Sequence, residues 1–154
     1  MKKALAGLRN LCTKREYCVF DVKEKALKAM DGNASAAADI VSSLVKDGFV
    51  DNRRYASAFA REKSAISAWG KNKIRYALSL KKVTKEDIEY AVSEIDSGKS
   101  EARMEAMIAR KRAALKNDPQ WKLKLLRFAL GRGYEYDEIM RAIAGQADAD
   151  ENVY

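Results

Sequence analysis

The sequence has no histidine, a single proline and only two cysteines, and each scarcity excludes a class of function. Without histidine, the commonest general base is missing, and so are the Ser-His and Cys-His arrangements of nucleophilic catalysis. Cys12 and Cys18 cannot complete a zinc site by themselves, because such sites draw their ligands mostly from several Cys and His. No Gly-rich phosphate loop is present. We therefore expect a protein that is not an enzyme and that carries no metal or cofactor.

Long hydrophobic runs are also missing, and this bears on location. No stretch approaches the roughly 18 apolar residues that cross a bilayer. The apolar start of the chain is interrupted by Arg9 and Lys14 too early to serve as a secretion signal. We expect a cytoplasmic protein without membrane contact, and in that reducing compartment Cys12 and Cys18 should be free thiols.

Positive charge is in excess: 30 Lys and Arg stand against 22 Asp and Glu, a net charge of +8. Residues 1–15 hold five basic and no acidic groups, residues 71–85 six and none, and residues 99–132 ten and three. After Gly133 the sign reverses, with Arg141 against six acids. A single basic run is most often a solvated helix face, but three runs in related places suit a polyanion or an acidic protein surface.

A short pattern recurs three times along the chain. The Ala-Leu steps that begin at Ala26, Ala77 and Ala129 lie 51 and 52 residues apart. A period near 50 residues indicates one supersecondary unit used three times. Such a row offers a long surface rather than one deep pocket. Each step is followed by an isoleucine that begins an apolar helical stripe, and these isoleucines are Ile40, Ile88 and Ile139.

Helical periodicity runs through nearly the whole chain. Asp51 and Thr84 stand where a helix N-cap is expected, and Gly48 stands where a helix should end. Asp118-Pro119 is typical of an N-cap followed by the first residue of a helix. Tyr17–Val22 alone looks strand-like, and we interpret it as the start of a helix because a lone strand has nothing to pair with.

The predicted fold is all-α, with nine helices grouped as three tandem three-helix-bundle repeats in an elongated array. The repeats span residues 1–50, 51–97 and 98–146, and an acidic flexible tail covers residues 147–154. Neighbouring repeats must share contacts, because units of about 50 residues bury too little apolar surface alone.

Three segments carry a family resemblance. Residues 15–22, REYCVFDV, are similar to the pattern R-x-Y-S-x-x-E-L. Residues 44–56, LVKDGFVDNRRYA, are similar to L-x-x-x-G-(F/Y/L)-(I/V)-D-(D/E)-x-R-(F/Y)-A, and residues 70–83, GKNKIRYALSLKKV, to G-x-x-x-I-x-x-x-L-x-x-K-G-(I/V). The chain therefore resembles the RecX family, the bacterial regulators of the RecA recombinase.

The chain departs from the family pattern at a few structural positions. Cys18 stands where serine is usual, so the helix that begins there should have a weaker cap. Asn52 stands in place of an acid, Lys82 in place of a glycine, and Asp21-Val22 in place of Glu-Leu. These differences put helix boundaries in doubt more than the resemblance itself.

The resemblance implies a curved, elongated molecule that binds along the groove of the RecA–DNA filament and lowers RecA ATPase and strand exchange. It implies a place in DNA repair, recombination and the SOS response. The basic charge agrees, because a filament that contains DNA is a long, partly anionic partner that successive repeats can touch. We expect a monomer that also touches the backbone of single-stranded or duplex DNA without sequence preference.

Candidate contacts with the filament or with DNA are chosen on charge alone. They are Lys71, Lys73, Arg75, Lys81, Lys82, Arg103, Arg110, Lys111, Arg112, Lys122, Lys124 and Arg127. Because three consecutive helix positions cannot all be buried, we expect residues 110–112 to be partly exposed. Reversing their charge should then change the melting temperature little. Trp69, Tyr76, Trp121 and Phe128 could stack on bases, although such stripes are more often core.

Two other functions stay open. Three-helix units of this size are typical of helix-turn-helix and homeodomain modules, whose last helix reads the major groove. Those helices are acidic here, with Glu86, Asp87, Glu89 and Glu94 in one repeat and residues 137–138 in the next, which disfavours sequence-specific reading. The third possibility is a basic adaptor for an acidic protein partner.

Overall fold

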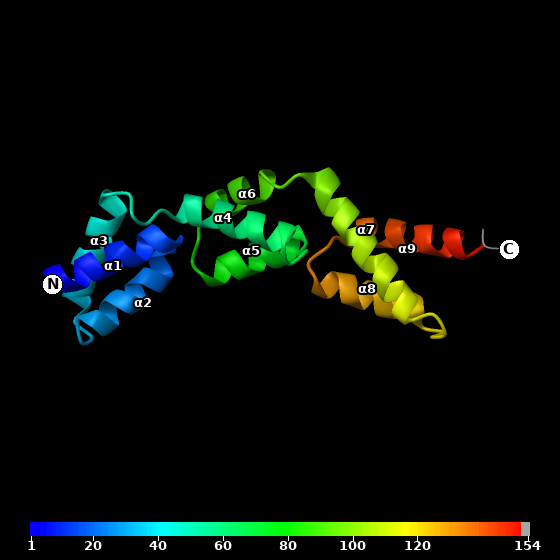
Figure 1. Ribbon diagram of the computed structural model, residues 1–154, viewed down its shortest axis with the longest axis horizontal. Helices are drawn as coiled ribbons and strands as arrows, with labels where there is room; N and C mark the ends of the chain where they lie inside the picture. Colours follow the sequence, from blue (N-terminus) through cyan, green and yellow to red (C-terminus); the bar gives the residue numbers. More distant parts are fainter. Residues whose placement is uncertain (152–154) are drawn as a thin grey trace. The chain divides into compact units, whose positions relative to one another are not determined.

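The computed structural model describes residues 1–151, and its regular structure is helical (Figure 1). Over this part of the chain there are nine α-helices and no strand, so the all-α prediction is confirmed. The segment Tyr17–Val22 leads into a helix, as predicted. The helices are α1 (Lys2–Lys14), α2 (Val19–Ala29), α3 (Ala34–Lys46), α4 (Asn52–Ala65), α5 (Lys71–Leu80), α6 (Lys85–Ser93), α7 (Ser97–Ala114), α8 (Trp121–Gly131) and α9 (Tyr136–Glu151).

The residues that mark the repeats occupy matching places in the order of helices. Ala26, Ala77 and Ala129 lie on α2, α5 and α8, the second helix of each group of three. The isoleucines that follow them lie on α3, α6 and α9, and all three are buried. The helical-repeat fold is thus confirmed, while the repeat boundaries near residues 50 and 97 stay a prediction.

The chain forms two compact units. The first unit comprises residues 1–59 and 77–91, and the second comprises residues 60–76 together with residue 92 and those after it. The division passes through α4, α5 and the end of α6, so the middle group of helices contributes to both units.

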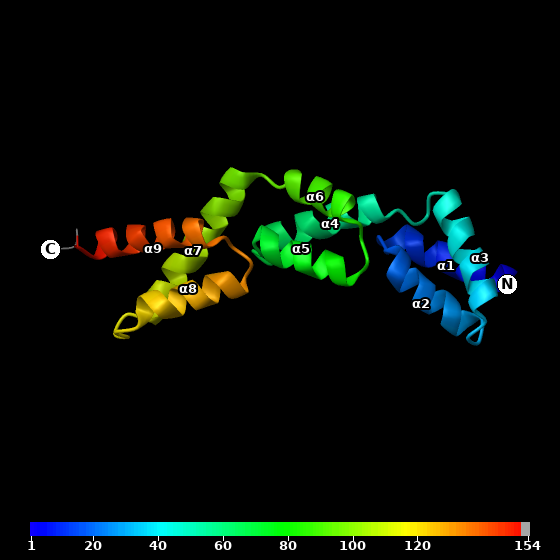
Figure 2. The same cartoon turned by 180° about the vertical axis from the view of Figure 1, so that it is seen from behind.

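In the first unit, α1, α2 and α3 pack on one another as a three-helix bundle, which Figure 1 and Figure 2 show from opposite sides. Its core is aliphatic and includes Leu8, Val22, Ile40, Leu44 and Val50. Burial of each such side chain contributes roughly 1.5–3 kcal/mol.

Three helix boundaries of the first unit follow local rules that the sequence predicts. Gly48 has a φ of 78° and ends α3. The Asp51 carboxylate accepts from the Arg54 N–H at 3.1 Å at the start of α4. The Thr84 hydroxyl accepts from the Asp87 N–H at 3.3 Å at the start of α6.

The start of α2 is capped from a distance instead. Cys18 stands at the N-cap, fully buried, and its side chain makes no capping hydrogen bond. The Oδ1 atom of Asn52 accepts from the Val19 N–H at 2.8 Å and takes over this role. The weak local cap expected from Cys18 is therefore accompanied by a long-range cap from the first residue of α4.

In the second unit, α7, α8 and α9 pack together around Met104, Ile108, Leu125 and Ile139. The half-buried rings of Trp121 and Phe128 pack against this core, which confirms the core interpretation for both. Tyr76 differs, because its side chain is 66% exposed.

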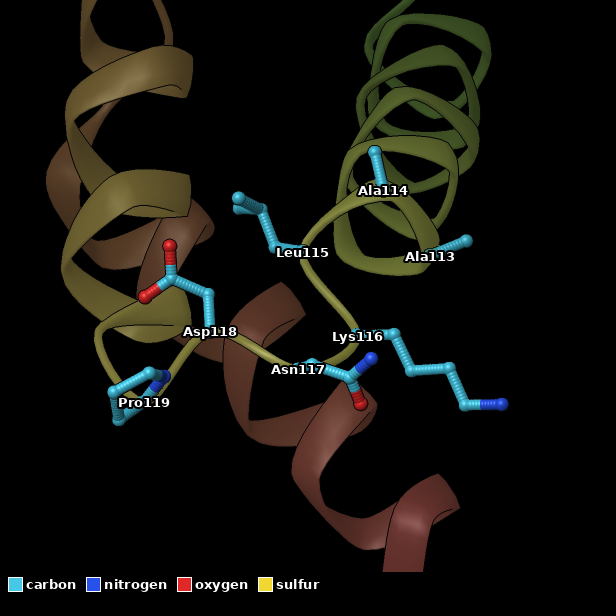
Figure 3. A pocket seen from close by; sticks show the side chains of 7 residues that line it. All are labelled: Ala113, Ala114, Leu115, Lys116, Asn117, Asp118 and Pro119. Atoms are coloured by element: carbon cyan, nitrogen blue, oxygen red, sulfur yellow. The ribbon is translucent and has the colours of Figure 1, made fainter.

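The sequence predicts that the helix after Asp118 begins at Pro119, but α8 begins at Trp121. Asp118 still caps the chain, since its carboxylate accepts from the Gln120 N–H at 2.8 Å. The turn that follows is tighter than an α-helix, because the Trp121 N–H bonds to the Asp118 carbonyl. Figure 3 shows this α7–α8 connection, where residues 113–119 border a hollow of about 610 Å³.

α9 continues through Glu151, beyond the end predicted near Gly145. Ala147 and Ala149 favour helix, and the Asp150 carboxylate forms an ion pair with Arg112 at 2.7 Å. The predicted tail is therefore helical over residues 147–151, whereas residues 152–154 lie outside the described residues. Its flexibility stays a prediction.

Candidate partner-binding surface

The second unit contains a close junction between the α4–α5 loop and the α8–α9 turn. The Gly70 N–H donates to the carbonyl of Arg132 at 2.7 Å. The Asn72 N–H donates to the carbonyl of Gly133 at 3.0 Å. These bonds satisfy N–H groups at the start of α5, which have no partner within the helix itself.

The two segments approach so closely that both need glycine. A Cβ atom on Gly133 would lie 2.4 Å from the Lys73 nitrogen, and one on Gly70 would lie 2.4 Å from the Gly133 carbonyl carbon. Gly133 also has a φ of 95°, a conformation that L side chains rarely adopt. The Tyr134 hydroxyl strengthens the junction by donating to the carbonyl of Ala68 at 2.6 Å.

The candidates on α5 in the second unit lie half-buried near this junction. Lys71 Nζ donates to the hydroxyl of the first residue of α7 at 3.2 Å. Lys73 Nζ lies 4.4 Å from the centre of the Trp69 ring. Arg75 lies 4.0 Å from the Glu135 carboxylate. Of these three contacts, only that of Arg75 is with an opposite charge.

Lys81 and Lys82 belong to the first unit and differ in availability. Lys81 Nζ lies 2.8 Å from the Asp21 carboxylate, and this hydrogen bond raises the pKa of Lys81. Its charge is therefore largely compensated. Lys82 is exposed, with a φ of 60° in the left-handed region, at the position where the family pattern has glycine.

The candidates on α7 are placed in three different ways. Arg103 donates to the Ser64 hydroxyl at 3.2 Å and is half-buried. Arg110 is exposed. Lys111 is half-buried, with Nζ 5.0 Å from the centre of the Phe128 ring.

Arg112 is largely covered, so among residues 110–112 the exposed charge is Arg110. The Arg112 side chain is 15% exposed and is paired with Asp150 at 2.7 Å. Its guanidinium carbon lies 3.9 Å from the centre of the Trp121 ring, and one nitrogen donates to the Leu115 carbonyl at 3.2 Å. Charge reversal here would remove all these contacts, so for Arg112 we now expect a lower melting temperature.

The candidates on α8 are all exposed. Lys122 Nζ lies 5.5 Å from the centre of the Trp121 ring. Lys124 forms an ion pair with Asp118, and the hydrogen bond from Lys124 holds the pKa of that carboxyl below its usual value. Arg127 makes no hydrogen bond, ion pair or ring contact within residues 1–151 and is free to meet a partner.

One hollow of the second unit, of about 410 Å³, brings two of the candidates together with a basic residue that sequence reasoning misses. Arg110, Lys111 and Arg132 line it, and we call it the basic groove. Arg132 stands between two helix-ending glycines, so a search of helix faces passes over it. The remaining lining residues are Ile66, Ser67, Ala68, Met107, Ala114 and Phe128, and none is acidic.

Two cations of the basic groove rest on an aromatic ring. Lys111 and Arg132 lie 5.0 and 5.2 Å from the centre of the Phe128 ring. A ring positions a cation without cancelling its charge as a carboxylate does. Within the described residues neither forms an ion pair, in contrast to Lys81 and Arg112.

The chemistry of the remaining groups is structural. Burial raises the pKa of both Cys12 and Cys18, which favours the less nucleophilic protonated thiol. Neither cysteine is in a disulfide. Within residues 1–151, no His, Cys, Asp and Glu side chains gather in a group of three that could hold a metal ion. Over the same residues, no helix combines the length and apolarity needed to cross a membrane.

The fold and this surface define a basic helical-repeat protein. Residues 51–92 match the family model described as RecX, second three-helix domain. Residues 101–143 match the one described as RecX, third three-helix domain. The chain belongs to the RecX family.

Individual relatives carry the same name. Regulatory protein RecX from Clostridium botulinum (strain Eklund 17B / Type B) is 34% identical over 136 residues, which cover 85% of this chain and 60% of the relative. The chain thus spans about 60% of the length of that relative. Regulatory protein RecX from Pseudomonas putida (strain GB-1) is 28% identical over 143 residues, which cover 92% of this chain and 89% of the relative.

Solved structures share the fold. The crystal structure of RecX from Lactobacillus salivarius aligns with a TM-score of 0.81 at 18% identity, over 94% of each chain. Another crystal structure, of regulatory protein RecX, aligns with a TM-score of 0.83 at 17% identity, over 93% of this chain and 71% of that one.

Proposed function

We propose that this protein is a regulator that binds the RecA–DNA filament and lowers RecA ATPase and strand-exchange activity. Its family membership supports a regulatory role, since the relatives are named regulatory proteins. The observation that carries the proposal is the basic groove, where Arg110, Lys111 and Arg132 gather with no acidic residue among the lining side chains. Such a cluster of positive charge suits an anionic partner surface.

The action we propose is occupancy without chemistry. Weak contacts made by successive repeats add up to tight binding, provided that the partner repeats along its length as a filament does. A bound molecule would then block growth of the filament and brace its subunits. We expect a monomer to suffice, because the repeats within one chain supply the multiple contacts.

The proposed contacts rank by how much charge each candidate keeps. Cations on rings or in solvent keep their charge, whereas those paired with a carboxylate or held by a hydrogen bond to a hydroxyl are less available to a partner. The first group is Lys73, Lys82, Arg110, Lys111, Lys122 and Arg127, with Arg132 added. The second group is Lys71, Arg75, Lys81, Arg103, Arg112 and Lys124.

Contact with the DNA backbone is part of the proposal, but reading of base sequence is not. The first turn of α6 would enter the major groove if the middle repeat acted as a helix-turn-helix module. That turn carries Glu86 and Asp87, and Arg53 pairs with them at 3.2 and 2.8 Å. A turn of this charge, held in an ion-pair network, is a poor reader of DNA.

The test is the DNA-dependent ATPase of RecA from the same organism. We expect inhibition at amounts well below one protein per RecA subunit, because a block to filament growth acts at ends. The variant R110E/R132E should need at least about tenfold more protein, since each lost charged contact costs about 1.5 kcal/mol or more. The variant K99E/K116E changes the charge equally at exposed sites of the second unit that lie outside the basic groove.

A pull-down with RecA–single-stranded DNA filaments, compared with DNA alone and RecA alone, identifies which partner is bound. The proposal is supported if the protein is retained strongly on filaments and only weakly on DNA alone or RecA alone. Absence of both filament binding and inhibition at equimolar protein contradicts it and favours an adaptor for another acidic partner.

A further inference from the structure

We propose that the basic groove binds an acidic, amphipathic peptide segment of a partner protein. This inference rests on the proposed function for the identity of the partner, and it names the chemistry that the partner surface must present. The peptide would place an apolar side chain against Ile66 and carboxylates against the cations of the groove.

The apolar half of the groove is unusually open to water. Ile66, the first residue after α4, is 80% exposed. Met107 and Phe128 add apolar surface beside it, one buried and one half-buried. A partner that covers this patch would remove apolar area from water, which is favourable in proportion to that area.

The charged half complements carboxylates. Arg110, Lys111 and Arg132 come from α7 and from the α8–α9 turn, and no Asp or Glu lines the groove. Arginine binds carboxylates through two parallel hydrogen bonds, so two arginines favour an acidic ligand of defined geometry.

The groove is also preformed. Ile66, Ser67 and Ala68 line one part of it, and the Tyr134 hydroxyl bonds to the carbonyl of Ala68 at 2.6 Å. The neighbouring glycine junction fixes the α4–α5 loop against the turn that carries Arg132. Its volume of about 410 Å³ holds a few side chains rather than a whole domain.

A peptide suits this surface better than a nucleic acid. Base stacking needs a free aromatic face, whereas the one ring in the groove, Phe128, already has Lys111 and Arg132 over it. The most exposed apolar residue is aliphatic Ile66, which does not stack on bases. Helix-in-groove binding, in contrast, uses aliphatic anchors of this kind.

Fluorescence anisotropy with the full chain tests the inference. The probe is a fluorescein-labelled peptide of about 15 residues, with leucine at every third or fourth position and glutamate elsewhere. One comparator replaces the leucines by serine, a second replaces the glutamates by glutamine, and a third is a labelled oligothymidine. We expect the first peptide to bind at least about tenfold more tightly than each comparator.

Matched variants locate the binding. Ile66→Ser should weaken peptide binding about tenfold and leave the circular dichroism unchanged, since its side chain is exposed. Leu123→Ser, which removes an exposed leucine from α8 outside the groove, should bind as the parent does. Arg132→Gln should weaken binding and flatten its salt dependence.

Other outcomes overturn the inference. Tight oligothymidine binding that depends on Ile66 and Arg132, with no peptide binding, assigns the groove to nucleic acid. Self-association that Ile66→Ser abolishes assigns it to a second copy of the chain. Peptide binding without RecA inhibition removes the proposed function and leaves the groove standing, and inhibition without peptide binding does the reverse.

Discussion

The two units differ in how they cap the N-terminus of the second helix in a group of three, α2 in the first unit and α5 in the second. In the first unit the Val19 N–H of α2 bonds to the side-chain oxygen of Asn52 at 2.8 Å. In the second unit the Asn72 N–H of α5 bonds to the backbone carbonyl of Gly133 at 3.0 Å. Both acceptors come from much later in the chain, so each cap ties a helix to tertiary structure.

The difference lies in how much change each cap tolerates. A side-chain acceptor can be replaced by another of similar reach. A backbone acceptor requires two main chains to touch, which at Gly70 and Gly133 leaves no room for a Cβ atom. We therefore expect the first unit to tolerate substitution at its cap and the second unit not to tolerate it.

The largest expected loss of stability is at the glycine junction of the second unit. Gly133→Ala places a Cβ atom 2.4 Å from the Lys73 nitrogen and forces alanine into a φ of 95°. Relief requires backbone movement, and we expect a loss of about 3 kcal/mol or more in the free energy of unfolding. Urea denaturation measures it. Gly131→Ala is the control, because a methyl group there would meet nothing within 4 Å, and comparable losses in the two variants would contradict the comparison.

The first unit should be the more sensitive to alkali. Burial raises the pKa of Tyr55 to about 12, with smaller contributions from Cys18 and Asp21. The folded state holds this proton more tightly than the unfolded state, so the stabilisation is complete below about pH 10 and is lost as the pH rises towards 12. The loss should reach about 2 kcal/mol. Denaturation at pH 8 and pH 11.5 measures it, and Tyr55→Phe should lose less than the parent.

The Asn52 cap of the first unit should give a smaller loss of stability. Asn52→Ala removes the acceptor for Val19 and should cost about 1 kcal/mol. Asn52→Asp keeps an oxygen at the same reach and should retain most of the stability. Amide exchange at the start of α2 checks both variants, and a loss in Asn52→Ala as large as in Gly133→Ala would break the comparison.

The smallest expected effect has the opposite sign. Lys82 has a φ of 60°, which costs a non-glycine residue about 1 kcal/mol. Lys82→Gly relieves this strain and should raise the free energy of unfolding by up to about 1 kcal/mol. Thermal denaturation tests it, with Lys82→Ala as the control that keeps the strain. Equal stability of the two variants would show that the left-handed backbone carries no cost here.

Local signals account for what the sequence predicts correctly. Asp51, Thr84 and Gly48 act within a few residues of their own positions, so their types and spacing suffice. The repeat of Ala-Leu steps fixes the order of helices in the same way. The start of α8 is harder to predict, because Asp118 makes the expected cap while the turn after it is too tight to count as α-helix.

Long-range placement accounts for what the sequence leaves open. Nothing around Asn52 indicates that it serves α2, and nothing around Arg112 indicates that Asp150 will pair with it. The charge runs identify Arg110 and Lys111 but not Arg132, whose position depends on the glycine junction. Charge composition predicts that a basic surface exists, and only the fold shows which cations stay uncompensated.

The glycine junction also orders events during synthesis. The ribosome makes the chain from the N-terminus, so Gly70 and Asn72 emerge well before residues 132–133, whose carbonyl groups accept their hydrogen bonds. At about 5–20 residues per second, the start of α5 waits several seconds for its acceptor. Ile66 and the rest of the basic groove take shape only after Arg132 and Gly133 have left the ribosome. A nascent chain therefore cannot engage a partner through this groove while it ends before these two residues.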